Sequence, residues 1–156
     1  MDVDIWAKRP RPVVAPDAVV LGAWEPVTPG DVTWTRRQLA AALHDGARLA
    51  AVVEGAVERL LLCYEELASN ALRHGRPPTR TEVISDGRRW LIDVSDASPD
   101  AAPVPATDRD PADGGMGLLM VAQICAAHGW WVDGGRKHVW ALLHHGPDEE
   151  PAAGTR

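Results

Sequence analysis

Hydrophobic residues recur every three or four positions across residues 49–74, which is the clearest pattern in the chain. This spacing places them on one face of a helix, where they can pack against another layer of the protein. The face consists of Val57, Leu60, Leu61, Tyr64, Ala68, Ala71 and Leu72. Gly75 and the two prolines that follow it predict the end of the helix. The pattern therefore predicts one long amphipathic helix.

Two other helices are predicted from their boundary residues. Thr28-Pro29-Gly30-Asp31 is typical of a helix start, because Thr caps the first free amides, Pro fits the first turn and an acid follows three residues later. That helix is expected to reach about Leu43. A further apolar face over residues 118–128, followed by Gly129, predicts a third helix.

Strands are predicted where apolar residues alternate with polar ones or form short runs between turn residues. The predicted strands cover residues 19–24, 79–85, 88–95, 130–133 and 136–143. Asp86-Gly87 and Gly134-Gly135 are expected to join neighbouring strands as hairpin turns. Helices and antiparallel strands are partly segregated along the chain. We therefore expect an α/β (α+β) two-layer sandwich, with helices on one face of a mixed, mainly antiparallel sheet.

The remaining segments have no periodicity. Residues 1–17 are rich in Pro, Arg and Asp and are expected to form a flexible leader, and the polar residues 146–156 a disordered tail. One predicted domain therefore covers residues 18–145. Within it, residues 96–113 carry many Ala, Pro and Asp residues, and a loop of this length is usually functional or mobile.

Length and composition indicate one acidic domain. The 156 residues suffice for a single core, and the net charge of −6 argues against non-specific nucleic-acid binding. No apolar run approaches the roughly 18–20 residues of a membrane helix. No signal core precedes the first strand, so we expect a cytoplasmic protein. Cys63 and Cys125 lie in apolar helical stretches and are predicted to be reduced core residues rather than a disulfide.

Polar residues at helical spacing form a first candidate site. Glu66, Asn70 and His74 are four residues apart, so they lie along one side of the long helix, opposite its apolar face. A solvated helix face would show the same pattern. The functional alternative is a site in which Asn70 offers an oxygen to Mg²⁺ and Glu66 accepts a proton from a hydroxyl group or water.

Two further signals lie around the long loop. Gly114-Gly115-Met116-Gly117 either lets the backbone approach an anion at a helix start or is a flexible loop end. No Gly-Lys-Ser/Thr follows it, so the segment is not a P-loop. Asp96 closes a strand, where it either acts as a turn residue or accepts a hydrogen bond from an adenine amino group.

The order of these signals resembles a known family. The segments 66–75 (Glu-Leu-Ala-Ser-Asn-Ala-Leu-Arg-His-Gly), 93–96, 115–121 and 139–142 are similar to the GHKL ATP-binding superfamily, in particular to its anti-sigma-factor serine kinases. The resemblance covers about residues 19–143. It implies a histidine-kinase-like ATPase domain with a Bergerat-type ATP-binding fold, and ATP and Mg²⁺ as ligands. It also implies a homodimer, an anti-anti-sigma-type protein as substrate and a sigma factor as the sequestered ligand.

The resemblance implies a role for each matching residue. Glu66 matches the proposed general base, Asn70 the magnesium ligand and Asp96 the acid that recognises adenine. The other expected ATP-binding residues are Arg73, His74, Ser98, Gly115, Met116, Gly117 and Leu118; the arginine and histidine lie on the triphosphate side, and the glycines belong to a mobile lid over the phosphates.

Two positions depart from the family pattern. The first glycine box usually reads Asp-x-Gly-x-Gly, whereas Asp96-Ala97-Ser98-Pro99 stands here and stiffens the expected adenine pocket. His138 stands where a small hydroxyl residue often supports adenine. Both changes are expected to weaken nucleotide binding.

Three functions agree with these features. The first is a protein-serine kinase, in which Glu66 activates a serine of a partner protein and Asn70 binds the metal. The second is a module that binds ATP or a partner without phosphoryl transfer, which the altered glycine box favours. The third, a detached catalytic domain of a histidine kinase, needs an upstream helical hairpin with a phosphoacceptor histidine, and residues 1–45 show no such pair.

Overall fold

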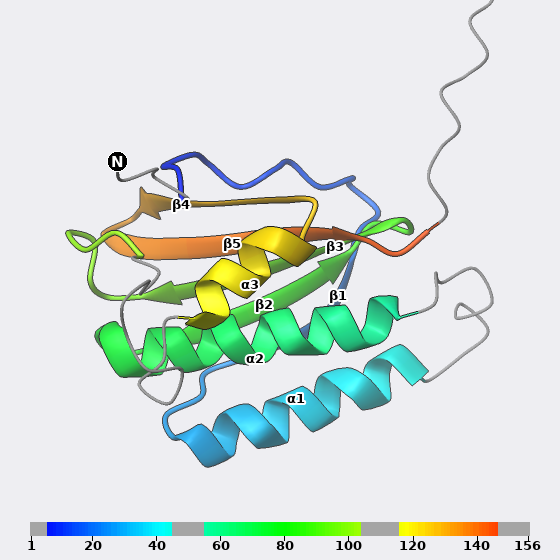
Figure 1. The fold of residues 1–156 in the computed structure, drawn as a ribbon, viewed down its shortest axis with the longest axis horizontal. Helices are drawn as coiled ribbons and strands as arrows, with labels where there is room; N and C mark the ends of the chain where they lie inside the picture. The colour runs from blue at the N-terminus through cyan, green and yellow to red at the C-terminus, as the bar shows by residue number, and fades with distance from the viewer. Residues whose placement is uncertain (1–5, 45–54, 104–115, 147–156) are drawn as a thin grey trace, which may run out of the picture.

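Five strands form one sheet in the computed structural model, which describes residues 6–44, 55–103 and 116–146. They are β1 (Val19–Trp24), β2 (Arg80–Ser85), β3 (Arg89–Asp96), β4 (Ala127–Asp133) and β5 (Arg136–His144). The order across the sheet is β1-β2-β3-β5-β4, and every neighbouring pair is antiparallel. The helices α1 (Pro29–His44), α2 (Ala56–His74) and α3 (Met116–Ile124) lie on one face (Figure 1). The expected two-layer architecture is confirmed.

Helix α1 begins where its capping residues predict. The Asp31 amide donates to the Thr28 hydroxyl at 3.2 Å, and the Asp31 carboxylate accepts hydrogen bonds from the amides of Val27 (2.9 Å) and Thr28 (3.0 Å). This reciprocal arrangement satisfies amides that a helix start leaves free. The start of α1 was therefore predictable from local sequence alone.

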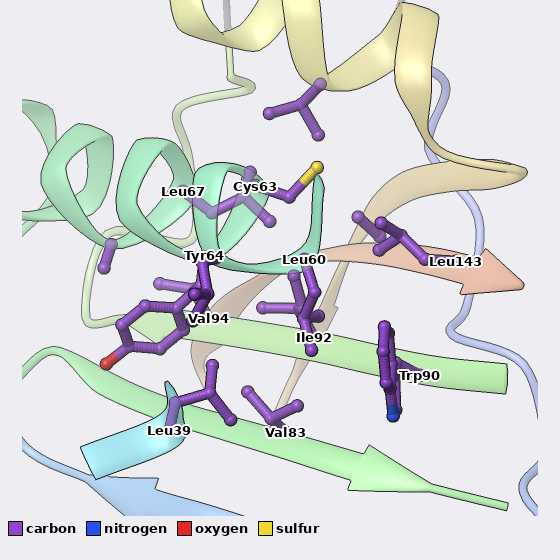
Figure 2. Close-up of a cluster of buried hydrophobic side chains, with 14 of the residues drawn as sticks. Leu39, Leu60, Cys63, Tyr64, Leu67, Val83, Trp90, Ile92, Val94 and Leu143 are labelled. Atoms are coloured by element: carbon purple, nitrogen blue, oxygen red, sulfur yellow. The ribbon is translucent and has the colours of Figure 1, made fainter. Parts of the chain in front are cut away.

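Helix α2 packs its apolar face on the sheet (Figure 2). Leu60, Tyr64 and Ala68 have no exposed surface, as their spacing predicts. The Tyr64 hydroxyl donates to Thr35 on α1 at 2.6 Å and lies 3.1 Å from the Thr81 hydroxyl on β2. The Tyr64 side chain of α2 thus connects α1 and α2 to strand β2 of the sheet.

The start of α2 differs from the predicted one. Gly55 has a φ of 79°, a left-handed conformation that a helix interior does not contain, and the helix begins at the next residue. A helix running without interruption from residue 49 is therefore wrong. Residues 49–54 lie outside the part of the chain that the structure describes.

The third helix is shorter than predicted. It ends at Ile124, and residues 127–129, which are predicted to end the helix, pair with residues 140–142 of β5 as the start of β4. Main-chain pairing along the nine-residue β5 satisfies these groups. Tertiary pairing therefore overrides the helical pattern at this point, and the second hairpin is longer than its sequence signal.

Side chains of β3 and β5 alternate between two faces of the sheet. Ile92 and Val139 face the helices and belong to the main core. Leu91 and Trp140 belong to a smaller cluster on the opposite, outer face. This alternation decides which polar residues of the two strands can approach the helices.

Residues 6–11 pack along the sheet, which corrects the prediction of a flexible leader over residues 1–17. Trp6 is 1% exposed, and the Arg9 amide donates to the carbonyl of Trp130 on β4 at 2.8 Å. The Trp140 indole donates to the Arg9 carbonyl at 3.0 Å. Figure 1 shows this segment in blue beside β4. Hydrogen bonds from indole groups and the burial of Trp6, which composition does not reveal, hold residues 6–11 against the rest of the domain. Residues 1–5 lie outside the described ranges.

The cysteines are free thiols, as predicted: Cys63 is buried and Cys125 partly buried. Burial raises the pKa of Cys63 to about 12 and that of Cys125 to about 11, so both stay protonated at neutral pH and react slowly. Of the helices in the described ranges, none combines the length and the apolar composition that crossing a membrane requires.

Candidate functional site

The C-terminal ends of α2 and β3 meet at Gly75 and Asp96. The Gly75 amide donates to the Ala71 carbonyl at 2.8 Å and closes the last turn of α2. A Cβ atom on Gly75 would lie 2.5 Å from both Cγ and Oδ2 of Asp96, so the carboxylate occupies the space that a side chain would need. The Ala97 amide donates to the Arg76 carbonyl at 2.8 Å. Backbone contact therefore holds Asp96 over the helix end.

Asp96 is 2% exposed, and its carboxylate already has partners from this chain. Its Oδ1 accepts a hydrogen bond from the Ser98 amide at 2.7 Å and another from the Ser98 hydroxyl. The Lys137 ammonium lies 3.5 Å from Oδ2 and donates to the Ala101 carbonyl at 2.8 Å. Lys137 itself is 5% exposed. Ser98 and Lys137 therefore stabilise a buried charge that would otherwise be costly.

The Glu66 carboxylate lies against the first turn of α3. A Cβ atom on Gly117 would lie 1.9 Å from Oε2 of Glu66, so the carboxylate occupies the space beside this glycine and would have to move if residue 117 carried a side chain. Burial, and secondarily the charge of Glu65, raises the pKa of Glu66 above its ordinary value, while Arg73 opposes the shift. Glu66 is thus a half-buried acid between two helices and not part of a fully solvated helix face.

Asn70 is half-buried one turn after Glu66, and Arg73 and His74 are exposed on the last turn of α2. Within the described ranges, no three His, Cys, Asp or Glu side chains gather to hold a metal ion. Asn70 offers one hard oxygen ligand, which suits Mg²⁺ when phosphate oxygens and water complete its coordination. The residues present therefore fit a metal that arrives with a nucleotide.

Of three further expected site residues, Gly115, Met116 and Leu118, the structure describes the side chain of Leu118 alone. Gly115 lies outside the described residues, and Met116 begins α3 with a side chain whose position is not described. The Leu118 side chain is 1% exposed in the main core. Its carbonyl accepts a hydrogen bond from the Trp6 indole at 3.3 Å. At Leu118, therefore, the side chain serves packing.

His138 is not on the helical side, which corrects its expected place beside adenine. Its Nδ1 lies 2.9 Å from Oδ1 of Asp93, and the Arg11 guanidinium donates to Oδ2 of Asp93 at 2.9 Å. These residues line a hollow of about 680 Å³ on the outer face, together with Trp131 and Arg136. Alternation along β5 places Lys137, the neighbouring residue, beside Asp96. In the hollow, Arg11 and His138 pair with Asp93, and Arg136 donates to the Ser95 hydroxyl. The motif residues Glu66 and Asp96 lie on the helical face, so we place the candidate chemistry there.

Lys137 is the site residue that the sequence-based interpretation missed. A signal for it existed, because Val139, Ala141 and Leu143 form the apolar face of the same strand, and Lys137 continues that alternation. A lysine at such a position must lie close to a buried acid or leave the core.

Comparison with models of known protein families finds a match over most of the chain. The model of the histidine kinase-like ATPase domain matches residues 26–141, which is well over half of the chain. The chain belongs to this family. Comparison with curated proteins finds no match. The family's domains bind ATP, generally with Mg²⁺, so membership supports an ATP-binding regulatory role for this domain.

Replacing Gly75 with Ala should destabilise this histidine kinase-like domain by about 1–3 kcal/mol, the usual cost of forcing atoms into a packed site. The new methyl group would meet the Asp96 carboxylate and the Ala71 carbonyl, 2.7 Å away, and neither can withdraw easily. Gly30→Ala is the matched control, because its nearest neighbour would be 3.6 Å away. Urea denaturation should show little change for this control. Equal midpoints for the two variants would mean that Asp96 does not occupy this position.

Proposed function

We propose that this domain is a protein serine/threonine kinase that acts as an anti-sigma factor on an anti-anti-sigma-type partner. The proposal rests on the position of the Glu66 carboxylate, which lies against Gly117 of α3. Glu66 itself is one helical turn before Asn70 on α2. An acid in this position is suited to accept a proton from a hydroxyl group. A module that only bound ATP would not need it. The similarity of residues 66–75 to anti-sigma-factor kinases supports the partner class, a sequestered sigma factor and a homodimer.

In the proposed reaction, a partner serine gives its hydroxyl proton to Glu66 while its oxygen bonds to the γ-phosphorus of ATP. The bond from the γ-phosphorus to the bridging oxygen breaks, and ADP leaves with that electron pair. Bound Mg²⁺ would neutralise phosphate charge during the transfer. Arg73 is exposed on the last turn of α2 and opposes the rise in the pKa of Glu66, and its guanidinium would bind phosphate oxygens. Asn70 and Asp96 would position the nucleotide.

A second function is supported by a different observation. The Asp96 carboxylate already accepts hydrogen bonds from Ser98 and faces Lys137. Fewer of its acceptor sites are therefore left for a nucleotide base. A domain with a weakened base site could bind a partner, or ATP, without transferring phosphate.

The deciding experiment is incubation of the full chain with γ-labelled ATP, Mg²⁺ and candidate anti-anti-sigma-type proteins. The kinase proposal predicts label on a serine of one partner. A partner that binds the chain and remains unlabelled, while ATP is bound, would favour the binding module and exclude the kinase.

The transfer rate should also depend on pH through Glu66. A general base must be deprotonated, and burial raises the pKa of Glu66 above the ordinary glutamate value of about 4.3. As pH falls through this raised pKa, Glu66 becomes protonated and the rate should decline, at a higher pH than for an ordinary glutamate. Single-turnover rates measured alongside ATP binding will test this. A rate that stays constant down to the ordinary glutamate range would contradict the assignment of Glu66 as the base.

A further inference from the structure

Lys137 is a buried cation that the proposed phosphoryl transfer does not use. It projects from β5 into the helical side of the sheet, where it is 5% exposed. Its ammonium lies 3.5 Å from Oδ2 of Asp96 and donates to the Ala101 carbonyl at 2.8 Å. Burying a lysine costs several kcal/mol unless the charge is paired. Pairing with Asp96 offsets this cost and places a cation beside the acid that is expected to recognise the base.

The Asp96 carboxylate and the Lys137 ammonium have more hydrogen-bonding sites than their partners in the described ranges use. Each carboxylate oxygen offers about two acceptor sites. Oδ1 of Asp96 uses its sites for the amide and hydroxyl of Ser98, whereas Lys137 is the one polar partner of Oδ2 in the described ranges. The ammonium has three donors, of which one goes to Ala101 and one faces Asp96. Counted over the described residues, Asp96 Oδ2 therefore retains an acceptor site and the Lys137 ammonium retains a donor, and these two atoms lie 3.5 Å apart.

An acceptor beside a donor matches the edges of two kinds of purine. Adenine presents an amino group that donates and a neighbouring ring nitrogen that accepts. A 6-oxopurine presents the reverse order, a carbonyl oxygen that accepts and a neighbouring ring N–H that donates. A carboxylate alone would pair with the amino group but repel the carbonyl oxygen. A carboxylate with an adjacent ammonium can satisfy either edge.

We propose that Lys137 is a specificity-determining residue that lets this site bind 6-oxopurine nucleoside triphosphates as well as ATP. The proposal rests on the proposed nucleotide site at Asp96 and adds to it a second base-recognising group. Lys137 lies on the helical face and Ser98 bonds Oδ1, so Oδ2 and the ammonium are the groups left for the base.

The test compares binding of ATP and of inosine triphosphate, each with Mg²⁺, to the wild type and to Lys137→Met. We expect the wild type to bind the two nucleotides with dissociation constants within about tenfold of each other. In Lys137→Met the ratio should shift by about 10- to 100-fold against inosine triphosphate, because its carbonyl oxygen loses its donor and faces a carboxylate. Lys137→Arg, which keeps a cationic donor, should restore much of the wild-type ratio.

The ratio of the two dissociation constants separates a change in specificity from a folding defect, because a folding defect weakens the binding of both nucleotides alike. Lys137→Thr provides a second variant if the methionine variant does not fold. Rejection of inosine triphosphate by a wild type that binds ATP, or an unchanged ratio in a folded variant, would overturn this inference and leave the ATP site intact. A wild type that binds neither nucleotide would remove the site itself, and the role of Lys137 with it.

Discussion

Glu66→Gln should lower phosphoryl transfer to the partner by about 10²–10⁴-fold, the range typical of a lost general base. Glutamine keeps the size and helix preference of the residue but has no carboxylate to take the serine proton. ATP binding should change little, or improve slightly because one negative charge near the phosphates is removed. Single-turnover transfer and equilibrium binding, measured on the same preparations, separate these two effects.

Glu58→Gln is the matched control for this substitution. Glu58 is exposed in the first turn of α2, two turns before Glu66, and its loss should leave transfer unchanged. If Glu66→Gln transfers phosphate at the wild-type rate, the carboxylate is not the base, and its contact with Gly117 has only a structural role.

Asn70→Ala should weaken Mg²⁺-dependent ATP binding by about 10- to 100-fold, the usual loss for one bond to a charged group. The substitution removes the oxygen that Asn70 offers to the metal, while alanine favours the helix at least as well as asparagine. Folding should therefore be preserved. Equilibrium dialysis with and without Mg²⁺ measures the effect, since the loss should disappear when the metal is absent.

Ser69→Ala provides the comparison for Asn70, because Ser69 is also half-buried on α2 and is its direct neighbour. It should bind ATP as the wild type does. An Asn70→Ala variant with wild-type affinity in Mg²⁺ would exclude Asn70 as a ligand.

The sequence predicted most of the fold because its signals are local. The Thr28 cap, the helical spacing of α2 and the Asp86-Gly87 turn each depend on a few neighbouring residues, and each is found where it was expected. The end of α3 was not predictable in this way. Residues 127–129 continue a helical pattern, but they pair with residues 140–142 of strand β5, which lie outside that pattern. The packing of Trp6 has the same non-local origin.

The candidate site was predicted in part. Helical spacing placed Glu66 and Asn70 on one side of α2, but it left open whether that side is solvated; the contact with Gly117 depends on where α3 packs. On β5, the sequence-based interpretation placed His138 on the helical face of the sheet, but its side chain lies on the outer face. Family spacing indicated His138, whereas strand alternation turns His138 outward to Asp93 and Lys137 inward to Asp96. A single residue of register therefore exchanges an imidazole for an ammonium in the proposed base site.

In the proposed kinase, ATP binds on the helical face, between α2, α3 and the end of β3, and not in the outer hollow. Chemical-shift mapping by NMR on the full chain, titrated with Mg²⁺ and ATP, distinguishes the two locations. Trp131 and His138 line the outer hollow and report on that alternative. We expect the resonances of the Gly75 and Gly117 amides and of the Asn70 side-chain amide to shift, and that of the Trp131 indole to stay unchanged. Shifts confined to Trp131 and His138, or none at saturating ATP, would contradict it.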